Sequence, residues 1–450
     1  MRRAIPILRT EIAPMLRLAG PVVLAEIGWV MMGIVDTIMV GRLGPVEIGA
    51  VGLGSILFIA VAIFGMGLLL GLDTLVAQSF GAGRLDECHR WLLHGVALSL
   101  FLAAPLTAAA WLGTDALSLL DFDPAVLALT RSYLHIVIWS LLPLLLYASF
   151  RRYLQALGFV QPVMFALISA NVINALVNWV LIFGRAGFAA LGTDGAAWAT
   201  VVSRIYLAVF LFGSVVLYDA RQRGQLAQVS RRIEGARLLR LVRLGLPAAT
   251  QVTLEMGVFA AAGALAARLD PVSLASHQLV LHMASFTFMV PLGLASAGAV
   301  RVGHAIGRRD AVGASCAGWT ALFLGVTFMS AASLAFVGLP GPLLRLFTDS
   351  SAVVRTGTSI LLIAALFQPF DGAQGVATGV LRGAGNTRTP MAANLAAHWL
   401  VGLPTGYVLC FSAGVGVTGL WAGLGLGLVA VAVVLLAVWR RTERHLRWQF

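Results

Sequence analysis

The stretch that decides the fold runs from Arg17 to Arg42 and reads RLAGPVVLAEIGWVMMGIVDTIMVGR. It is long enough to cross a bilayer as one helix, since a crossing takes about 20 mainly apolar residues. It nevertheless contains two carboxylates, Glu26 and Asp36, and a charge at the centre of a membrane helix costs about 2.5–3.5 kcal/mol. Ionisable groups inside the membrane are functional by default. The stretch therefore predicts a membrane helix that contributes to a site.

The composition of the whole chain is typical of a polytopic membrane protein. Of its 450 residues, 59% are apolar and 11% are charged, and the mean hydropathy is +0.91, which excludes a large water-soluble domain. The net charge of +12 comes from arginine alone, and the arginines separate apolar runs instead of forming one basic face. This distribution excludes nucleic-acid binding. The three cysteines, Cys88, Cys316 and Cys410, lack metal-site spacing and are expected to be packing residues.

Apolar runs of sufficient length predict twelve membrane-spanning helices. They lie at about residues 18–40, 48–77, 91–113, 132–150, 160–184, 188–217, 242–267, 272–300, 312–338, 356–380, 390–411 and 416–439. The last two runs share an uncharged tract that is broken only at residues 412–416, which we interpret as a turn. The fold class is therefore an all-α membrane protein, and prolines inside the runs are expected to bend their helices.

The second half of the chain repeats the first at a constant offset of 226 positions. This offset carries Pro21 to Pro247, with Gly81 matching Gly307 and Pro143 matching Pro369. Because six crossings separate the copies, both start on the same side of the membrane and are parallel repeats, whose interface is where transporters of this kind bind substrate. We expect an N-lobe at residues 1–222, a charged linker at 223–237 and a C-lobe at 238–450. These would be two pseudo-symmetric lobes of six helices each.

Arginine positions predict the orientation. If the N-terminus is cytoplasmic, 24 of the 31 arginines fall in the inner connections and helix ends, as the positive-inside rule requires. Both termini are therefore expected in the cytoplasm.

Several segments resemble the multidrug and toxic compound extrusion (MATE) family in its bacterial NorM-type branch. They are Asp36–Gly44, Gly81–Gly83, Leu254–Gly257, His277–Gln278, Pro291–Leu294 and Gly379–Gly385. The resemblance implies a MATE/MOP-type fold in the bacterial inner membrane, with a cleft between two lobes that opens alternately to each side. It also implies export of amphipathic, often cationic, small molecules in exchange for Na+ or H+, without a cofactor. We expect the protein to work in the bilayer as a monomer.

Asp36 is the candidate acid of the N-lobe. Asn171, Asn174 and Asn178 are spaced so that they share one face of the fifth span. One carboxylate with neutral oxygens can hold Na+, and a desolvated carboxylate can instead take up a proton. The resemblance implies a cation site at Asp36, Asn174 and Asn178, to which Thr200 could add a hydroxyl. The alternative is a hydrogen-bonded cluster that only stiffens the lobe.

Glu255 and Asp371 are the candidate acids of the C-lobe. The resemblance implies that both take part in cation coupling and substrate binding, with Na+ as one candidate occupant. A carboxylate in a cleft can attract a cationic compound and release it when Na+ or H+ takes its place. The alternative is structural pairing with a neighbouring arginine.

Four further residues are candidates for lining the cleft: Glu26, Asp73, His277 and Gln278. Glu26 lies about 15 Å along the helix from the other acid of the first span, at a different depth. His277 could be a proton-linked switch, or it could be a packed histidine with its hydrogen bonds satisfied. Arg204 is the base deepest in a span, where it needs a carboxylate or carbonyl partner and is expected to be structural.

The predicted function is that of a secondary antiporter and not of an enzyme. The sequence contains no GxxxxGK[ST] loop for a nucleotide phosphate, and its eight histidines are scattered along the chain. The main alternative is a flippase or exporter of a lipid-linked or metabolite substrate on the same superfold, which would need a basic cleft. A channel is a further alternative, disfavoured by the buried acids.

Overall fold

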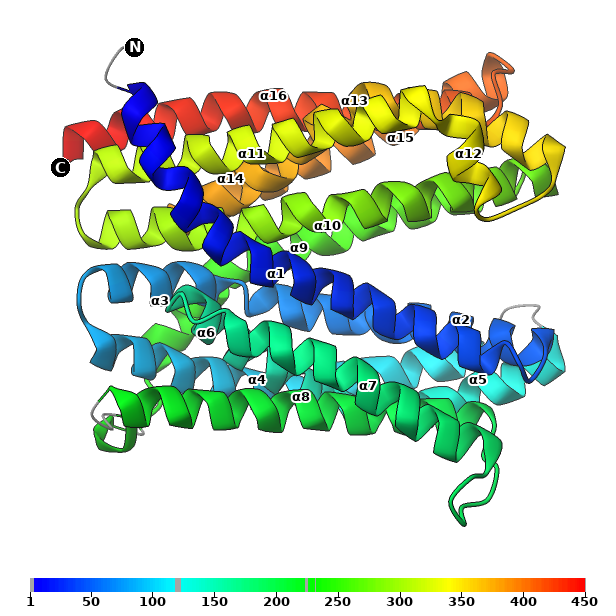
Figure 1. Ribbon diagram of the computed structural model, residues 1–450, viewed down its shortest axis with the longest axis horizontal. Helices are drawn as coiled ribbons and strands as arrows, with labels where there is room; N and C mark the ends of the chain where they lie inside the picture. Colours follow the sequence, from blue (N-terminus) through cyan, green and yellow to red (C-terminus); the bar gives the residue numbers. More distant parts are fainter. Residues whose placement is uncertain (1–3, 118–122, 223–225, 231, 450) are drawn as a thin grey trace. The chain divides into compact units, whose positions relative to one another are not determined.

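A computed structural model of the protein describes residues 4–117, 123–222, 226–230 and 232–449. Over these residues the chain is helical and contains no strand (Figure 1). Twelve of the helices described are long and apolar enough to cross a membrane, which confirms the predicted spans. Residues 223–225 and 231 of the predicted linker lie outside the described part.

The helices follow the two halves of the sequence. The first half contains α1 (Ala4–Val40), α2 (Pro45–Leu68), α3 (Gly71–Gly81), α4 (Leu85–Ala116), α5 (Pro124–Val137), η2 (Ile138–Ser140), α6 (Leu141–Ala156), α7 (Gln161–Phe183), α8 (Thr193–Arg221) and η3 (Leu226–Gln228). The second contains α9 (Gly235–Ala266), α10 (Pro271–Gly307), α11 (Ala311–Gly338), α12 (Pro340–Arg345), α13 (Ser351–Gly383), α14 (Arg388–Asn394), η4 (Leu395–Gly402), α15 (Leu403–Tyr407), η5 (Val408–Ser412) and α16 (Val417–Gln449).

Matching residues of the two repeats mark where helices begin and end. Pro45 begins α2 and Pro271 begins α10, as proline favours the first helical position, where its missing N–H is not needed. Gly81 ends α3 and Gly307 ends α10. The predicted repeat is thus present in the helix boundaries.

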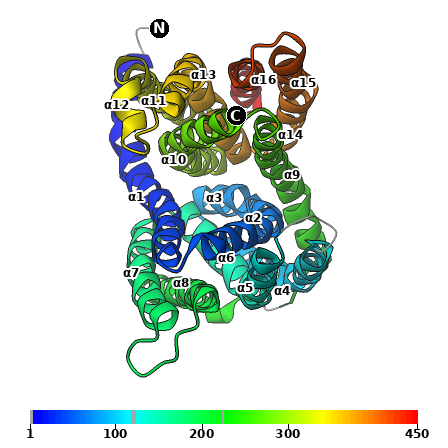
Figure 2. The same cartoon turned by 90° about the vertical axis from the view of Figure 1, so that its right-hand side faces the viewer.

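The chain divides into two compact units. The N-unit is Leu24–Ala249, and the C-unit is Met1–Val23 together with Thr250–Phe450. Figure 2 shows the helices of each unit end-on. These units differ from the predicted lobes, because the first helix of each repeat begins in the opposite unit. The change occurs after Val23 in one repeat and after Ala249 in the other, which are matching positions.

Two matching glycines contact the residues at which the units change. A Cβ added at Gly67 of α2 would lie 2.5 Å from Cα of Ala249 within the N-unit. A Cβ added at Gly293 of α10 would lie 3.0 Å from the backbone N of Val23 within the C-unit. Only glycine allows backbones to approach this closely, and such contacts hold membrane helices together. The predicted linker at residues 223–237 therefore does not coincide with the position at which the chain passes from one unit to the other.

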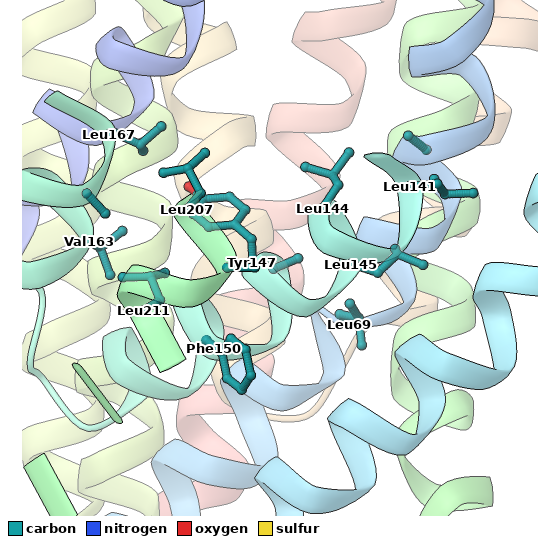
Figure 3. Packing of buried hydrophobic residues seen from close by; sticks show 14 of the residues in the cluster. Leu69, Leu141, Leu144, Leu145, Tyr147, Phe150, Val163, Leu167, Leu207 and Leu211 are labelled. Carbon is teal, nitrogen blue, oxygen red and sulfur yellow. The ribbon is translucent and has the colours of Figure 1, made fainter. Parts of the chain in front are cut away.

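The core of the N-unit is built around α6. Leu141, Leu144, Leu145 and Tyr147 are fully buried. Figure 3 shows them beside Leu69 of the turn between α2 and α3 and beside side chains from neighbouring helices, which include Val163, Leu167, Leu207 and Leu211. In a bilayer the lipid is as apolar as these side chains, so the stabilisation comes from close van der Waals packing.

The eleventh span departs from a regular α-helix. Between α14 and α16 it contains two π-helical segments, η4 and η5. Pro404 lies just after η4 and has no N–H to donate, and its ring would clash with a carbonyl four residues earlier in an α-helix. A π-turn relieves this conflict, and such turns occur often at functional sites. Sequence reasoning predicted bends at prolines but not this type of turn.

Candidate cation sites in the two units

The candidate acids of the N-unit fall into two groups, and the first is paired with arginine. Arg151 of α6 forms an ion pair with Glu26 of α1 and also donates to the Tyr147 hydroxyl at 3.4 Å. Its neighbour Arg152 pairs with Asp73 of α3 at 3.5 Å. Adjacent positions on a helix point in different directions, so α6 ties α1 and α3 to itself. Two of the residues predicted to line a cleft thus have fixed counter-charges.

Asp36 is held by amide and hydroxyl groups instead. Asn178 Nδ2 on α7 donates to Asp36 Oδ1 at 2.6 Å and to Asn174 Oδ1 at 3.1 Å. Thr200 Oγ1 on α8 donates to Asp36 Oδ2 at 3.4 Å. The two asparagines are fully buried, whereas Asp36 is half-buried. The structure therefore brings the three predicted N-lobe residues together and places the Thr200 hydroxyl, considered from the sequence, beside them.

Two polar residues near this cluster, Asn171 and Arg204, form their hydrogen bonds with other groups. Asn171 shares the helical face but donates to Gly28 O and Leu167 O, each at 2.8 Å, so it serves packing. Arg204 donates to Ser140 Oγ at 2.6 Å, and its guanidinium lies 4.2 Å from the centre of the Phe58 ring. Arg204 forms no ion pair within the described part of the chain.

The C-unit contains a cluster with two carboxylates. Gln374 Nε2 of α13 donates to Glu255 Oε1 on α9 at 3.1 Å and to Asp371 Oδ1, one turn back, at 3.3 Å. Asn394 Nδ2 of α14 donates to Glu255 Oε2 at 3.4 Å. One glutamine thus bridges the two predicted acids.

The cluster continues beyond Asn394. Its Oδ1 lies 3.1 Å from Nδ1 of His398 in η4, and both side chains are fully buried. Gln374 Oε1 and His398 Nε2 are buried without a hydrogen-bond partner among the described residues. Sequence reasoning missed Gln374, Asn394 and His398. Their signal was spacing, because each polar residue stands three or four positions from another polar residue in an apolar run.

In the described part of the chain, His277 and Gln278 form no hydrogen bond with this cluster. His277 is fully buried, and its Nδ1 accepts a hydrogen bond from Trp421 Nε1 at 3.0 Å. Gln278, next to it on α10, is exposed. The structure thus places His277 in the packing between α10 and α16, which matches the structural alternative.

The oxygen ligands of the two clusters suit a hard cation. Their free groups include the oxygen acceptors Asn178 Oδ1 and Gln374 Oε1. In the part of the chain that is described, no three His, Cys, Asp or Glu side chains gather into a metal site. Transition metals prefer nitrogen and sulfur ligands, whereas carboxylate and carbonyl oxygens suit hard cations.

Comparison with known proteins identifies the family. A model of the MatE family matches residues 21–180 and 247–408. The chain belongs to the MATE family. The two matched blocks start at Pro21 and Pro247, so each covers most of one repeat and contains one of the acidic clusters.

Bacterial relatives resemble the chain over nearly its full length. A probable multidrug resistance protein NorM from Mesorhizobium japonicum is 37% identical over 97% of this chain and 95% of its own. The multidrug resistance protein NorM of Photobacterium profundum is 31% identical over 98% of this chain and 96% of its own. A crystal structure of the eukaryotic MATE transporter AtDTX14 shares the fold, with a TM-score of 0.86 and 23% identity over 98% of this chain and 99% of that one. This MATE protein is therefore a multi-pass membrane protein of the MATE fold.

Proposed function

We propose that this protein is a secondary active antiporter of the bacterial inner membrane. It exports amphipathic, often cationic, organic compounds in exchange for Na+ or H+ by alternating access, as a monomer with both termini in the cytoplasm. Its NorM relatives are named as multidrug resistance proteins, and the arginine distribution supports the orientation.

The observation that carries the proposal is the distribution of arginine among the five candidate acids. Glu26 and Asp73 have arginine partners. Within the described residues, Asp36, Glu255 and Asp371 have only amide and hydroxyl donors. These three acids are half-buried, and a charge inside a membrane span without a counter-charge is costly, so they favour any cation that reaches them. The first two are fixed in the structure, and the other three remain available for exchange.

Exchange follows from competition for the same carboxylates. A cationic compound and the coupling ion each neutralise Glu255 and Asp371, so binding of one weakens binding of the other. A ligand shifts a conformational equilibrium only as far as it binds one state better than the other. The coupling ion, driven inward by its gradient, would displace the compound from the side facing outward.

The flippase alternative requires a basic cleft for a lipid-linked phosphate. Arg151 is buried and Arg152 is half-buried, and both are paired with carboxylates. Arg204 is also buried and donates to Ser140 within the N-unit, whereas the C-unit cluster is acidic. These features favour a cationic substrate over an anionic one.

The test is efflux of a fluorescent organic cation from proteoliposomes under separately imposed Na+ and H+ gradients. Wild type is expected to respond to at least one gradient, and Asp36→Asn and Glu255→Gln are expected to lose most of that response. Asp86→Asn, a neutralised acid on the exposed first turn of α4, is the matched control and should export normally. Equal gradient-driven export by all four proteins would contradict the proposal.

A further inference from the structure

A chain of hydrogen bonds connects Glu255 to a buried histidine in the π-helical part of the eleventh span. Asn394 donates through Nδ2 to Glu255 Oε2 at 3.4 Å, and its Oδ1 lies 3.1 Å from His398 Nδ1. The exposed fractions of the Asn394 and His398 side chains are both 0%. The carboxamide therefore links the two groups away from water.

The direction of these bonds fixes the form of the histidine. A carboxamide offers an NH2 donor at one end and an oxygen acceptor at the other. While Asn394 gives its NH2 group to the Glu255 carboxylate, its oxygen faces His398, so Nδ1 must carry the proton and donate. Nε2 is then an unprotonated acceptor, and it has no partner in the described structure.

A cation on Glu255 reverses this arrangement. A proton on the carboxyl group must be donated to an acceptor, and Na+ needs oxygen ligands instead of an NH2 group. Either occupant therefore favours a flipped Asn394 carboxamide, with its oxygen toward Glu255 and its NH2 group toward His398. Nδ1 of His398 must then accept. The ring must then carry its proton on Nε2. Water that enters while the transporter changes between its two open states takes the Nδ1 proton and supplies one to Nε2, so the charge of the ring does not change.

We propose that Asn394 and His398 sense whether Glu255 is occupied, and that His398 changes tautomer when a cation binds there. His398 is a positioning residue in this proposal, since it contacts neither Glu255 nor substrate directly. The inference rests on the coupling role of Glu255 proposed above.

The surroundings of His398 allow the signal to reach a helix contact. His398 lies in η4. Its carbonyl oxygen accepts a hydrogen bond from the backbone N–H of Leu403, five residues later, as in a π-helix. A Cβ added at Gly427 of α16 would lie 3.3 Å from His398 Cδ2, so the ring edge next to Nε2 faces α16. A proton that appears on Nε2 therefore appears at the contact between the eleventh and twelfth spans. The neighbouring Trp399 donates to Leu254 O at 3.1 Å, which anchors this segment beside Glu255.

The direct test is the 15N spectrum of histidine-labelled protein in lipid nanodiscs, because protonated and unprotonated ring nitrogens give well-separated signals. The His398 signals are those missing from His398→Phe. In choline chloride at alkaline pH we expect the proton on Nδ1. With saturating NaCl, or after acidification if H+ is the ion that drives efflux, we expect it on Nε2. An unchanged tautomer, or an imidazole protonated on both nitrogens, would overturn the proposal.

A second test uses the cation concentration that half-saturates efflux. His398→Phe removes both ring nitrogens and is expected to raise this concentration about tenfold, as for a lost buried hydrogen bond. His398→Asn keeps a donor and an acceptor near the Nδ1 position and is expected to change it less than about twofold. His277→Phe, at an equally buried histidine bonded to Trp421, is the matched control and should resemble His398→Asn. Equal effects of all three variants would count against the proposal.

Different results would contradict the coupling role of Glu255 and the sensing role of His398. If Glu255→Gln exports with the gradient response of wild type but His398 still changes tautomer with the cation, the coupling role of Glu255 is wrong. If Glu255→Gln abolishes the response and the His398 tautomer stays fixed, only the sensing role is wrong.

Discussion

Arg151 shows how the protein keeps a full charge inside a membrane helix bundle. Its guanidinium has both an ion pair with Glu26 and a contact with the Tyr147 hydroxyl, and its side chain is 8% exposed. Removing one partner of a buried pair leaves the other charge uncompensated, which costs about 3–5 kcal/mol. Glu26 therefore belongs to the structure of the N-unit.

We expect Glu26→Gln to lower the thermal unfolding temperature of the purified protein, because Arg151 loses its counter-charge. The double variant Glu26→Gln/Arg151→Met should recover most of the loss, since it leaves no isolated charge. Glu47→Gln, at a half-buried acid in the first turn of α2, serves as control. A single variant that melts with wild type would show that the pair does not stabilise the fold.

At this scale the sequence predicted which acids lie within the membrane spans but not which of them are paired. Asp36, Asn174 and Asn178 could be grouped because helical spacing and family resemblance agreed. The pairing of Glu26 with Arg151 joins residues from α1 and α6, and only tertiary packing decides it. The same reason hid Asn394 and His398, whose spacing on one helix was visible but whose neighbour Glu255 comes from α9.

The sequence predicted helix ends better than contacts between helices. Proline and glycine mark the ends of α2, α3 and α10 locally, so sequence reasoning could find them. The boundary between the two units lies where Gly67 and Gly293 pack closely against another helix. The sequence around a glycine in a membrane span does not show which helix it will contact.

Gly67→Ala tests the helix contact in the N-unit. The added methyl group would lie 2.5 Å from Ala249 Cα, and forcing such overpacking costs about 1–3 kcal/mol. We expect a lower unfolding temperature. Gly52→Ala, in the same helix with nothing within 4 Å of the added carbon, should be neutral or stabilising because alanine favours helix. Equal melting of the two variants would mean that the close contact is absent.

Asp270 gives a prediction for the start of α10. Its carboxylate accepts from the Ser273 hydroxyl at 2.6 Å and from the Ser273 N–H at 2.9 Å, and these bonds hold the pKa of Asp270 below its usual value. A lowered pKa in the folded state stabilises the fold above the ordinary pKa of aspartate, and this contribution is lost as pH falls through the lowered value. Asp270→Ala should therefore melt below wild type near neutrality, and the gap should narrow in acid. A gap that is constant with pH would contradict this origin.

The whole molecule combines two repeats whose first helices begin in the opposite units. Hydropathy, arginine positions and the constant repeat offset were sufficient to predict twelve spans and a duplicated fold. They could not predict the exchanged first segments, because the same apolar pattern suits packing in either unit. Each unit nevertheless keeps its own acidic cluster, with one carboxylate in the N-unit and two in the C-unit.

The central claim is that a coupling ion and a cationic compound compete for the carboxylates that lack arginine partners. Equilibrium binding of a fluorescent organic cation to the purified protein, displaced by NaCl or by acidification, tests this claim most directly. The account predicts that Na+ or H+ releases the bound compound from wild type, and that Glu255→Gln and Asp371→Asn bind it weakly and no longer respond to that ion. Unchanged binding and displacement in both variants would contradict it.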